Sequence, residues 1–427
     1  MNELEVADPE VAAALKDELA RQALTIELVA ATNFASRAVL EVQGSVFAHK
    51  TLEGYPGKRY HGGHRNVDVI EKLGVERAKE IFGAEHANVQ PHSGVSANTA
   101  VYFAVLQPGD GILGMDLATG GHLSHGHRAS FSGRFYRASF YGVDPDSEMI
   151  DHDEVLATAL RERPKMIVCG GSAYPRAIDF ARFREIADEA GAYLLADVAH
   201  FAGLIAGGAY PSPVPYADFV TFTTYKTFRG SRGGIILCRK EYADKIDAAV
   251  FPGVQGSMHV HLMAGKAVTF RLAMTQEFRD YAKQVVSNAR ALAKALQERG
   301  YRIVAGGTDS HIVLMDLRSK NITGKQAQEV LEGVGVVTNM NRIPFDPLGA
   351  NVTSGIRLGS SAMTTRGFGE AEMEETADII DAVLSHLGDE KTLQEARHSV
   401  RKLCMRFPLF LDRWEMGSAS TEYCVNR

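Results

Sequence analysis

The stretch Thr223-Thr224-Tyr225-Lys226-Thr227 ends an apolar segment and stands just before a glycine-rich loop, Arg229-Gly230-Ser231-Arg232-Gly233-Gly234. The apolar segment, Phe219–Tyr225, is rich in β-branched and aromatic residues and predicts a buried strand. A second predicted strand, Gly234–Leu237, follows the glycines. This strand–loop–strand unit places a lysine at the edge of a predicted sheet.

Helical and strand-like patterns alternate on the N-terminal side of this unit. Such alternation, with connections of a few residues, predicts a mostly parallel α/β sheet. We expect strands at Gly111–Met115, Lys165–Cys169 and Tyr193–Asp197, and helices at Ile70–Phe82 and Arg182–Ala190.

The pattern changes near residue 280, where a long amphipathic helix, Tyr281–Arg299, leads into a smaller α+β region. We expect an N-terminal arm over residues 1–30, a large domain over 31–280, and a small C-terminal domain and tail over 281–427. The arm has helical spacing in Pro9–Val29, and the segment after Pro408, with Trp414, predicts a loosely attached extension. In the small domain we expect strands near Arg302–Val304 and Ile312–Asp316, and helices near Gly324–Gly333 and Glu370–Leu387.

Composition and charge are those of an ordinary globular protein. The 427 residues are 45% hydrophobic and 23% charged, with a net charge of −6, which gives no footprint for nucleic acid or an anionic membrane. The acidic start, Met1–Glu5, lacks the layout of a signal peptide, and the apolar run Gly191–Gly208 contains charged and polar residues. Cysteines without CxxC spacing argue against zinc and for a reducing cytoplasm: Cys169, Cys238, Cys404 and Cys424.

Lys226 is the first candidate for chemistry. A side chain at a strand end of an α/β sheet points into the crevice where ligands bind. The neighbouring cation of Arg229 and partial desolvation are expected to lower the pKa of Lys226, making it an amine nucleophile. The alternative is a solvated loop lysine.

Asp197 closes a second strand, 29 residues before Lys226. Pyridoxal 5'-phosphate (PLP) works as an electron sink when its ring nitrogen stays protonated, and a buried carboxylate supports that protonation. The alternative for Asp197 is an Asx turn. Together the two residues indicate a PLP site.

A phosphate site is expected where Gln90–Ser96 leads into a predicted helix, Ala97–Leu106. Backbone N–H groups at a helix start, with the hydroxyl of Ser93, form an anion cradle, although a plain N-cap serine would look the same. The pattern GxxxxGK[ST] is absent, and GxGxxG occurs only at Gly109–Gly114, where it runs into the predicted strand Gly111–Met115 instead of following a strand and opening a helix, which disfavours nucleotide cofactors.

Three further groups are candidates for the site. His122 begins a histidine-rich loop that lacks a carboxylate at metal-ligand spacing, so an imidazole stacked on an aromatic cofactor is favoured over a metal site. His200 could brace Asp197 or the cofactor's phenolic oxygen, or be purely structural. Arg357 could clamp a substrate carboxylate or lie on the surface.

Read in order, the motifs of this chain resemble those of serine hydroxymethyltransferase, from about residue 25 to 410. The matching stretches are Glu53–Tyr60, Gly83–Gly94, Gly114–Leu117, Ser172–Arg176, Asp197–Gly203, Lys226-Thr227, Gly306–Asp309, Ile343–Pro347 and Ala362–Gly367.

The resemblance implies a PLP-dependent transferase of fold type I, the aspartate-aminotransferase type. The expected architecture is a large domain with a mostly parallel seven-stranded sheet and a smaller α+β C-terminal domain. The implied reaction moves the hydroxymethyl carbon of a serine-type amino acid to tetrahydrofolate, which leaves as methylenetetrahydrofolate. The implied assembly is a homodimer with shared active sites, or a tetramer.

Roles carry over by position. Lys226 is implied as the Schiff-base lysine, Asp197 as the partner of the ring nitrogen, His122 as the stacking group and Glu53 as the acid/base. Other implied cofactor contacts are Ser93, Gly94, Ser172, His200, Tyr225 and Gly256. Substrate contacts are Arg357, Thr32, Thr51 and His61, and folate contacts are Glu53, Tyr60, Leu117, Gly121, Leu123 and Asn341.

Departures from the family pattern gather around the same pocket. They are Ala31-Thr32 for the usual Ser-Glu, Thr51 for tyrosine, His61 for the second of a tyrosine pair, Tyr225 for histidine, and Ser257-Met258 for Gly-Pro. The loss of bulk and charge favours 2-methylserine over serine as substrate, with alanine, in its D form by family stereochemistry, as product. One alternative is a folate-independent aldolase or transaldolase on a β-hydroxy amino acid. Another is a non-catalytic PLP-fold binding protein.

Overall fold

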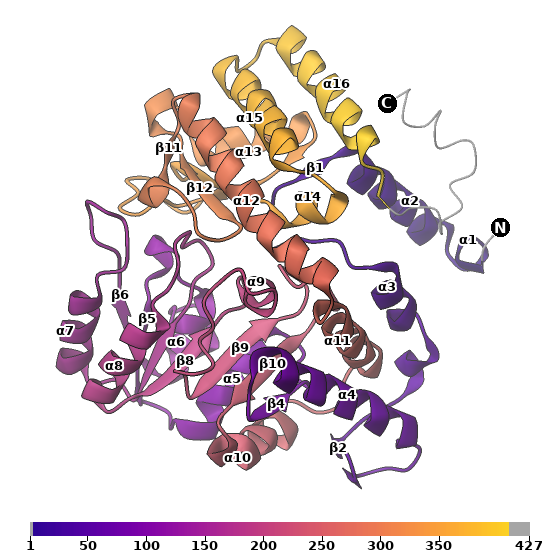
Figure 1. The fold of residues 1–427 in the computed structure, drawn as a ribbon, viewed down its shortest axis with the longest axis vertical. Helices are drawn as coiled ribbons and strands as arrows, with labels where there is room; N and C mark the ends of the chain where they lie inside the picture. Colours follow the sequence, from indigo (N-terminus) through magenta and orange to yellow (C-terminus); the bar gives the residue numbers. More distant parts are fainter. Residues whose placement is uncertain (1–2, 410–427) are drawn as a thin grey trace.

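The computed structural model describes residues 3–409 (Figure 1). The predicted extension after Pro408, with Trp414, lies almost wholly outside the described residues. Within residues 3–409, no helix is both long and apolar enough to cross a membrane.

The large lobe is built on a seven-stranded sheet in the order β4-β10-β9-β8-β7-β5-β6. Strands β9, β8, β7, β5 and β6 run parallel, and β10 is antiparallel to both of its neighbours. The predicted mostly parallel seven-stranded sheet is therefore confirmed. The strands are β4 (His86–Asn88), β5 (Gly111–Met115), β6 (Arg137–Tyr141), β7 (Met166–Cys169), β8 (Tyr193–Asp197), β9 (Phe219–Thr223) and β10 (Gly234–Cys238).

Both faces of this sheet are buried, which explains why its strands are continuous apolar runs. Alternate residues such as Ile112 and Leu195 pack on one face against α5, while Leu113 and Leu194 pack on the other. The helices of the lobe are α3 (Arg37–Gln43), α4 (Arg65–Phe82), α5 (Gly94–Val105), α6 (Phe131–Phe135), α7 (His152–Glu162), α8 (Phe180–Ala190), α9 (Ala202–Ala206), α10 (Ala243–Ala248) and α11 (Val260–Ala273). A short hairpin precedes α4: β2 (Gly54–Tyr55) and β3 (Lys58–Arg59).

The small lobe holds an antiparallel sheet in the order β11-β12-β15-β14, covered by helices drawn in orange to yellow in Figure 1. Its strands are β11 (Arg302–Ile303), β12 (Ile312–Asp316), β14 (Asn339–Asn341) and β15 (Gly355–Gly359). Its helices are α13 (Gly324–Gly333), α14 (Ser361–Arg366), α15 (Glu370–Ser385) and α16 (Glu390–Arg406).

The N-terminal segment packs on the small lobe. It contains α1 (Glu3–Ala7), α2 (Pro9–Leu24) and β1 (Ile26–Glu27), and β1 pairs in parallel with β13 (Val336–Val337). The helix predicted to reach Val29 ends at Leu24, because Thr25 is extended and the next residues join a sheet.

One helix, α12 (Gln276–Glu298), belongs to both lobes. Its first turns, with Phe278 and Tyr281, pack into the core of the large lobe, and its later turns, with Leu292 and Leu296, pack into the small one. The helix begins five residues before its predicted start, because the side chain of Thr275 accepts a hydrogen bond from the N–H of Phe278 as an N-cap.

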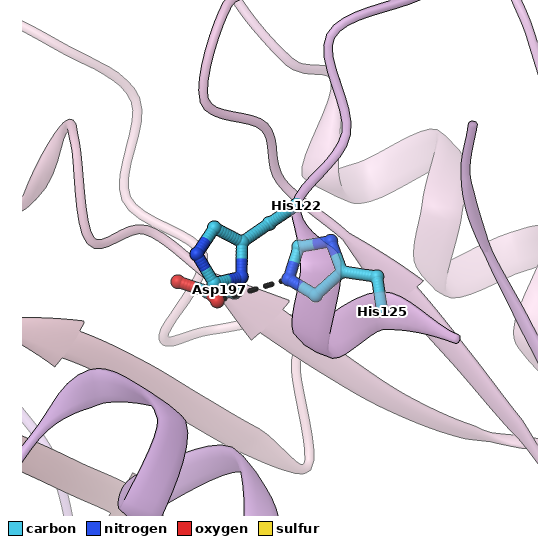
Figure 2. Close-up of side chains that lie close together, drawn as sticks. All are labelled: His122, His125 and Asp197. Atoms are coloured by element: carbon cyan, nitrogen blue, oxygen red, sulfur yellow. Dashed lines mark hydrogen bonds and ion pairs between the residues drawn. The ribbon is translucent and has the colours of Figure 1, made fainter. Parts of the chain in front are cut away.

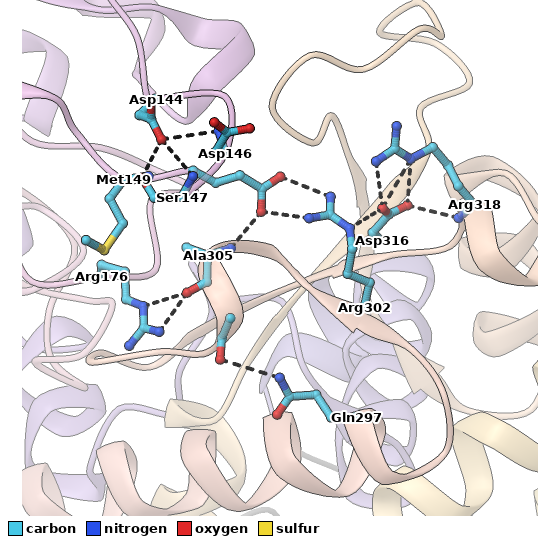
Figure 3. A network of polar contacts seen from close by, with 12 residues as sticks. Asp144, Asp146, Ser147, Met149, Arg176, Gln297, Arg302, Ala305, Asp316 and Arg318 are labelled. Atoms are coloured by element: carbon cyan, nitrogen blue, oxygen red, sulfur yellow. Dashed lines mark hydrogen bonds and ion pairs between the residues drawn. The ribbon is translucent and has the colours of Figure 1, made fainter. Parts of the chain in front are cut away.

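A charged network joins the lobes at their edge (Figure 3). Arg302 of β11 donates at 2.8 and 3.0 Å to Glu148, which lies before α7, and at 2.6 Å to Asp316 of β12. Arg176 of the large lobe donates to the carbonyl of Ala305 at 2.6 and 3.0 Å. The buried carboxylate of Glu148 is thus paired across the lobe boundary, while that of Asp316 is paired within the small lobe.

Candidate active site

A cavity of about 100 Å³ opens where β8 and β9 end, at the carboxyl edge of the parallel sheet. Asp197 is the last residue of β8, and Lys226 follows the end of β9 by three residues. Crevices at this edge are the usual ligand sites of α/β sheets. The lining residues are Ser93, Gly94, Val95, His122, His125, Gly171, Ser172, Asp197, Ala199, His200, Thr223, Tyr225 and Lys226.

Asp197 is a buried carboxylate held by three donors. Its Oδ2 accepts hydrogen bonds from His125 Nε2 at 2.9 Å and Asn98 Nδ2 at 2.8 Å, and its Oδ1 accepts from the N–H of Ala199 at 3.1 Å. Burial alone would raise the pKa of Asp197, but the hydrogen bond and charge of His125 hold that pKa well below its usual value. The group is therefore an ionised carboxylate in the cavity wall.

His125 is a site residue that was not predicted from the sequence. Figure 2 shows His122 and His125 from one loop lying beside Asp197, with only His125 hydrogen-bonded to it. The sequence shows no carboxylate at metal-ligand spacing in this loop, but the fold brings Asp197 to it from 72 residues away. Ligand atoms of the three groups lie within 4.8 Å of one another, but the carboxylate already accepts hydrogen bonds from His125 and Asn98.

His122 is neutral and faces the cavity. Burial lowers its pKa to about 4, although the charge of Asp197 opposes that shift. Its Nδ1 lies 2.7 Å from the hydroxyl of Ser124, which fixes the orientation of the ring. A neutral imidazole in this position suits stacking on a flat aromatic group.

Lys226 is buried, with 8% of its surface exposed, so the reading of a solvated loop lysine is wrong. Burial lowers its pKa to about 8; Asp197 opposes this shift and Arg357 adds to it. The expectation that Arg229 supplies the neighbouring cation is also wrong. The guanidinium of Arg229 lies 4.3 Å from the ring centre of Tyr281 and pairs with Glu277 instead.

Ser93 is the N-cap of α5, and its hydroxyl accepts from the N–H of Ser96 at 3.1 Å. Gly94 begins the helix in a tight position, since a Cβ there would lie 2.9 Å from Cγ2 of Thr223. The helix start therefore presents backbone N–H groups beside the end of β9, close to Lys226 in the chain. Both readings of Ser93, cap and anion cradle, fit this geometry.

Arg357 projects from β15 of the small lobe toward the large one. Its Nη1 donates to the carbonyl of Ser172 at 2.5 Å and its Nε to Asn339 at 3.2 Å. It is partly buried, and burial lowers its pKa to about 10. No carboxylate among residues 3–409 pairs with it, so the reading of a plain surface arginine does not fit.

His200 lines the cavity and contacts His311, a residue that was not predicted from the sequence. The two buried rings are stacked with their centres 5.4 Å apart. Burial lowers the pKa of His200 well below its usual value, and that of His311 to about 3. Both imidazoles are neutral.

A second group of predicted residues lies apart from this cavity. Glu53, Thr51, Tyr60, His61 and Gly256 are not among its lining residues. His61 Nε2 is 3.3 Å from a carboxylate oxygen of Glu53. The segments carrying these residues meet where the N–H of Leu52 donates to the hydroxyl of Ser257 at 3.1 Å.

Three of the residues that depart from the family pattern line a neighbouring cavity of about 530 Å³. Ala31 and Thr32 line it, and Tyr225 lines both this cavity and the one at Lys226. The guanidinium of Arg232 lies 4.3 Å from the ring centre of Tyr225. Asn33 Nδ2, next in the chain, donates to the carbonyl of Lys226 at 2.8 Å.

The predicted folate contacts are not among the residues that line the Lys226 cavity. Leu117 and Leu123, which precede and follow Gly121 in the sequence, are 40% and 47% exposed. A Cβ at Gly121 would lie 2.0 Å from the carbonyl oxygen of Met115, so only glycine fits. Asn341 lies on β14, beside the strand that carries Arg357.

The residues present fit PLP. Its aldehyde needs a reactive amine, which Lys226 offers, and its phosphate needs an anion cradle, which the start of α5 offers. Its ring nitrogen needs an acceptor, and Asp197 keeps a lone pair beyond its three donors. The fold and the site together define a PLP-dependent enzyme.

The family model for serine hydroxymethyltransferase matches residues 4–380. The chain belongs to this family, whose members are PLP-dependent one-carbon transferases with tetrahydrofolate as co-substrate.

Proposed function

We propose that the protein converts 2-methylserine and tetrahydrofolate reversibly into alanine and methylenetetrahydrofolate. The observation that carries this choice of substrate is the clustering of departures beside the reactive lysine. Ala31 and Thr32, at positions where the family pattern has serine and glutamate, share a cavity wall with Tyr225, the neighbour of Lys226. Smaller, uncharged side chains there leave room for a methyl group on Cα.

The roles of the cavity residues follow from their chemistry. Lys226 holds the cofactor covalently, and its lowered pKa makes a larger share of the released amine neutral than in an ordinary lysine. Asp197 keeps a proton on the ring nitrogen, and Arg357, which pairs with no carboxylate in the described part of the chain, binds the substrate carboxylate. When bound, PLP supplies the sink for the electron pair left when the Cα–Cβ bond breaks.

Glu53 is the proposed acid/base for the substrate hydroxyl proton. His61 Nε2, 3.3 Å away, replaces a phenol of the family pattern and can exchange a proton with the carboxyl group. The pair does not line the Lys226 cavity of its own chain. We therefore propose that Glu53 and His61 act in the site of a second copy, in a homodimer with shared active sites.

Exposed apolar side chains support a second copy at this face. Val95, which lines the cavity, and Phe103, on the same helix α5, are 47% and 58% exposed.

The buried free cysteines Cys169, Cys238 and Cys404 support a reducing compartment such as the cytoplasm.

A substrate panel tests the proposal. Folate-dependent release of alanine from 2-methylserine is expected to exceed release of glycine from L-serine. Restoring family residues with Thr32→Glu and Tyr225→His is expected to move the ratio of the two kcat/KM values toward serine by about tenfold or more. L-serine turning over as fast as 2-methylserine in the unmodified protein would refute the choice of substrate.

Mixing two inactive variants tests the shared site. If Glu53 acts in the partner's site, hybrids of Lys226→Ala and Glu53→Gln chains contain one complete site per dimer, and activity returns on mixing. If Glu53 acts in its own chain, every site of the hybrid lacks one group and the mixture stays inactive.

Folate-independent aldol cleavage is the second candidate, favoured by the His61–Glu53 pair, which could move the hydroxyl proton without folate. Cleavage of 2-methylserine at equal rates with and without tetrahydrofolate would establish it.

A further inference from the structure

Lys266 is a buried lysine that the proposed reaction does not use. It lies on α11, and only 1% of its surface is exposed. Buried lysines are rare and normally pair with a carboxylate. Here Nζ donates instead to three backbone carbonyls: Val89 at 2.7 Å, Pro91 at 2.9 Å and Gly234 at 3.1 Å.

These three carbonyls belong to the two loops that frame the cofactor site. Val89 and Pro91 lie between β4 and Ser93, the N-cap of α5. Gly234 begins β10, at the end of the glycine-rich loop that follows Lys226. The ammonium group of Lys266 therefore joins the loop before the anion cradle to the loop after the reactive lysine.

Two glycines allow the close packing around Nζ of Lys266. Gly233 has φ +145°, and a Cβ there would lie 2.1 Å from Cε of Lys266. A Cβ at Gly234 would lie 2.2 Å from the carbonyl oxygen of Ser93. Both glycines let the two loops and the lysine approach more closely than any side chain would permit.

The same loop is also held by a neutral residue. Gln255 donates to the carbonyl of Gln90 at 2.8 Å and accepts from the N–H of His92 at 3.2 Å. The carbonyls of residues 89, 90 and 91 thus each accept from a side chain. Lys266 is the cation among these donors, on the segment that leads into Ser93.

Burial lowers the pKa of Lys266 to about 7, and the negative charge of Glu71 opposes this shift. A neutral amine has two N–H groups, whereas three carbonyls surround Nζ, so the full set of hydrogen bonds requires the ammonium form. An anion bound at the nearby helix start would favour that form further.

We propose that Lys266 is a positioning residue for the phosphate of PLP. It fixes the loop that presents Ser93 and Gly94 against the turn that carries Lys226, and its charge supports the dianion. This inference rests on the proposed assignment of the phosphate to Ser93 and Gly94.

Comparing PLP with pyridoxal, which lacks the phosphate, separates this role from general stability. The apo form of Lys266→Met, which keeps the length of the chain without the charge, is titrated with each compound by absorbance. We expect its Kd for PLP to rise about tenfold or more while its Kd for pyridoxal changes little. Met263→Leu, a buried change on the same helix, is the matched control and should leave both values unchanged.

Equal weakening of both compounds by Lys266→Met would overturn the inference, because it would show a structural role only. An unchanged preference for PLP would overturn it as well. If Lys266→Met does not fold, Lys266→Gln, whose amide can donate two hydrogen bonds, serves in its place. There too a loss confined to PLP supports the role and any other result refutes it.

Ser93→Ala tells the two proposals apart. If Ser93→Ala leaves the preference for PLP over pyridoxal intact, the phosphate assignment itself is wrong. If Ser93→Ala reduces that preference and Lys266→Met does not, the assignment stands and only the inference about Lys266 fails.

Discussion

His200 Nδ1 lies 3.3 Å from His311 Nε2, with 18° between the planes of the two rings. The same Nε2 of His311 lies 3.1 Å from the carbonyl oxygen of Ala30, an acceptor only. His311 Nε2 must therefore carry the proton, which makes His200 Nδ1 the acceptor. The proton of neutral His200 then sits on Nε2, which is the tautomer that can donate into the cavity.

Replacing His311 with phenylalanine keeps a flat ring but removes the donor. We expect His311→Phe to leave His200 free to carry its proton on either ring nitrogen. This change should lower kcat by about tenfold, since a buried hydrogen bond to an oriented imidazole is lost. The pH profile of kcat should change as well. Unchanged turnover together with an unchanged profile would contradict the relay from Ala30 through His311 to His200.

The attachment of PLP to the apo protein should report the lowered pKa of Lys226. Only the neutral amine attacks the aldehyde, and burial lowers the pKa of Lys226 from its ordinary value of 10.5 to about 8. The rate constant should rise with pH up to about 8 and level off above it. Arg357→Met removes a cation that lowers this pKa, so it should move the midpoint to higher pH. A rate that keeps rising beyond about pH 10 would indicate an ordinary lysine.

Replacing Arg357 should weaken binding of the amino acid more than it slows the chemical step. Arg357→Lys keeps the charge but loses the two-pronged hydrogen bonding to a carboxylate, so KM for 2-methylserine should rise at least about tenfold. The Kd for PLP should stay near its original value. Arg232→Lys, which alters a cation stacked on Tyr225 but not the clamp, is the comparison variant. Equal KM values for the two variants would argue against the clamp.

The lobe boundary should depend on Arg302. Arg302→Met leaves the buried carboxylates of Glu148 and Asp316 without this partner, and we expect a loss of about 1–2 kcal/mol in the free energy of unfolding. Urea unfolding at neutral pH measures it, with Arg161→Met, whose pair with Glu162 is exposed, as the control.

The sign of the pH dependence at this boundary follows from Asp316. Burial would raise its pKa, but Arg318 and Arg302 hold it below its ordinary value of 3.8. The stability that this carboxylate contributes is present at neutral pH and is lost as pH falls through the lowered pKa. The cost of Arg302→Met should therefore shrink in acid, and a cost that grows there would contradict the pairing.

Local sequence determined the strands well where burial was complete. Gly111–Met115, Tyr193–Asp197 and Ile312–Asp316 have the predicted bounds, since each is a run of five residues that are all buried apart from the half-buried Tyr193. The strand β4 was not predicted, because His86–Asn88 is short and largely polar, and it exists only through pairing with β10. Partners distant in the chain decide such elements.

The same contrast holds for the site residues: local patterns predicted some of them, and pairings between distant residues decided the others. Strand ends predicted that Asp197 and Lys226 would meet, and both line one cavity. The pairing of His125 with Asp197 joins residues 72 positions apart, and no local pattern reports it. Lys266 left a clearer signal, a lone lysine between Gly265 and Ala267 in an apolar helix, which marks a charge on a buried face.

The helix that both lobes share also sets a length. Tyr281 of α12 donates to the carbonyl of Thr227, next to Lys226, and one turn later the carbonyl of Val285 accepts from Ser360, just past the strand of Arg357. The segments that carry Lys226, at the amine end of the substrate, and Arg357, at its carboxylate end, are thus both attached to one turn of α12. This turn has a rise of about 6 Å. β-Alanine has one more methylene between these groups than alanine, so we expect it to fit this fixed spacing less well. Discrimination between α- and β-amino acids would then depend on the helix that spaces Lys226 and Arg357 as well as on these side chains themselves.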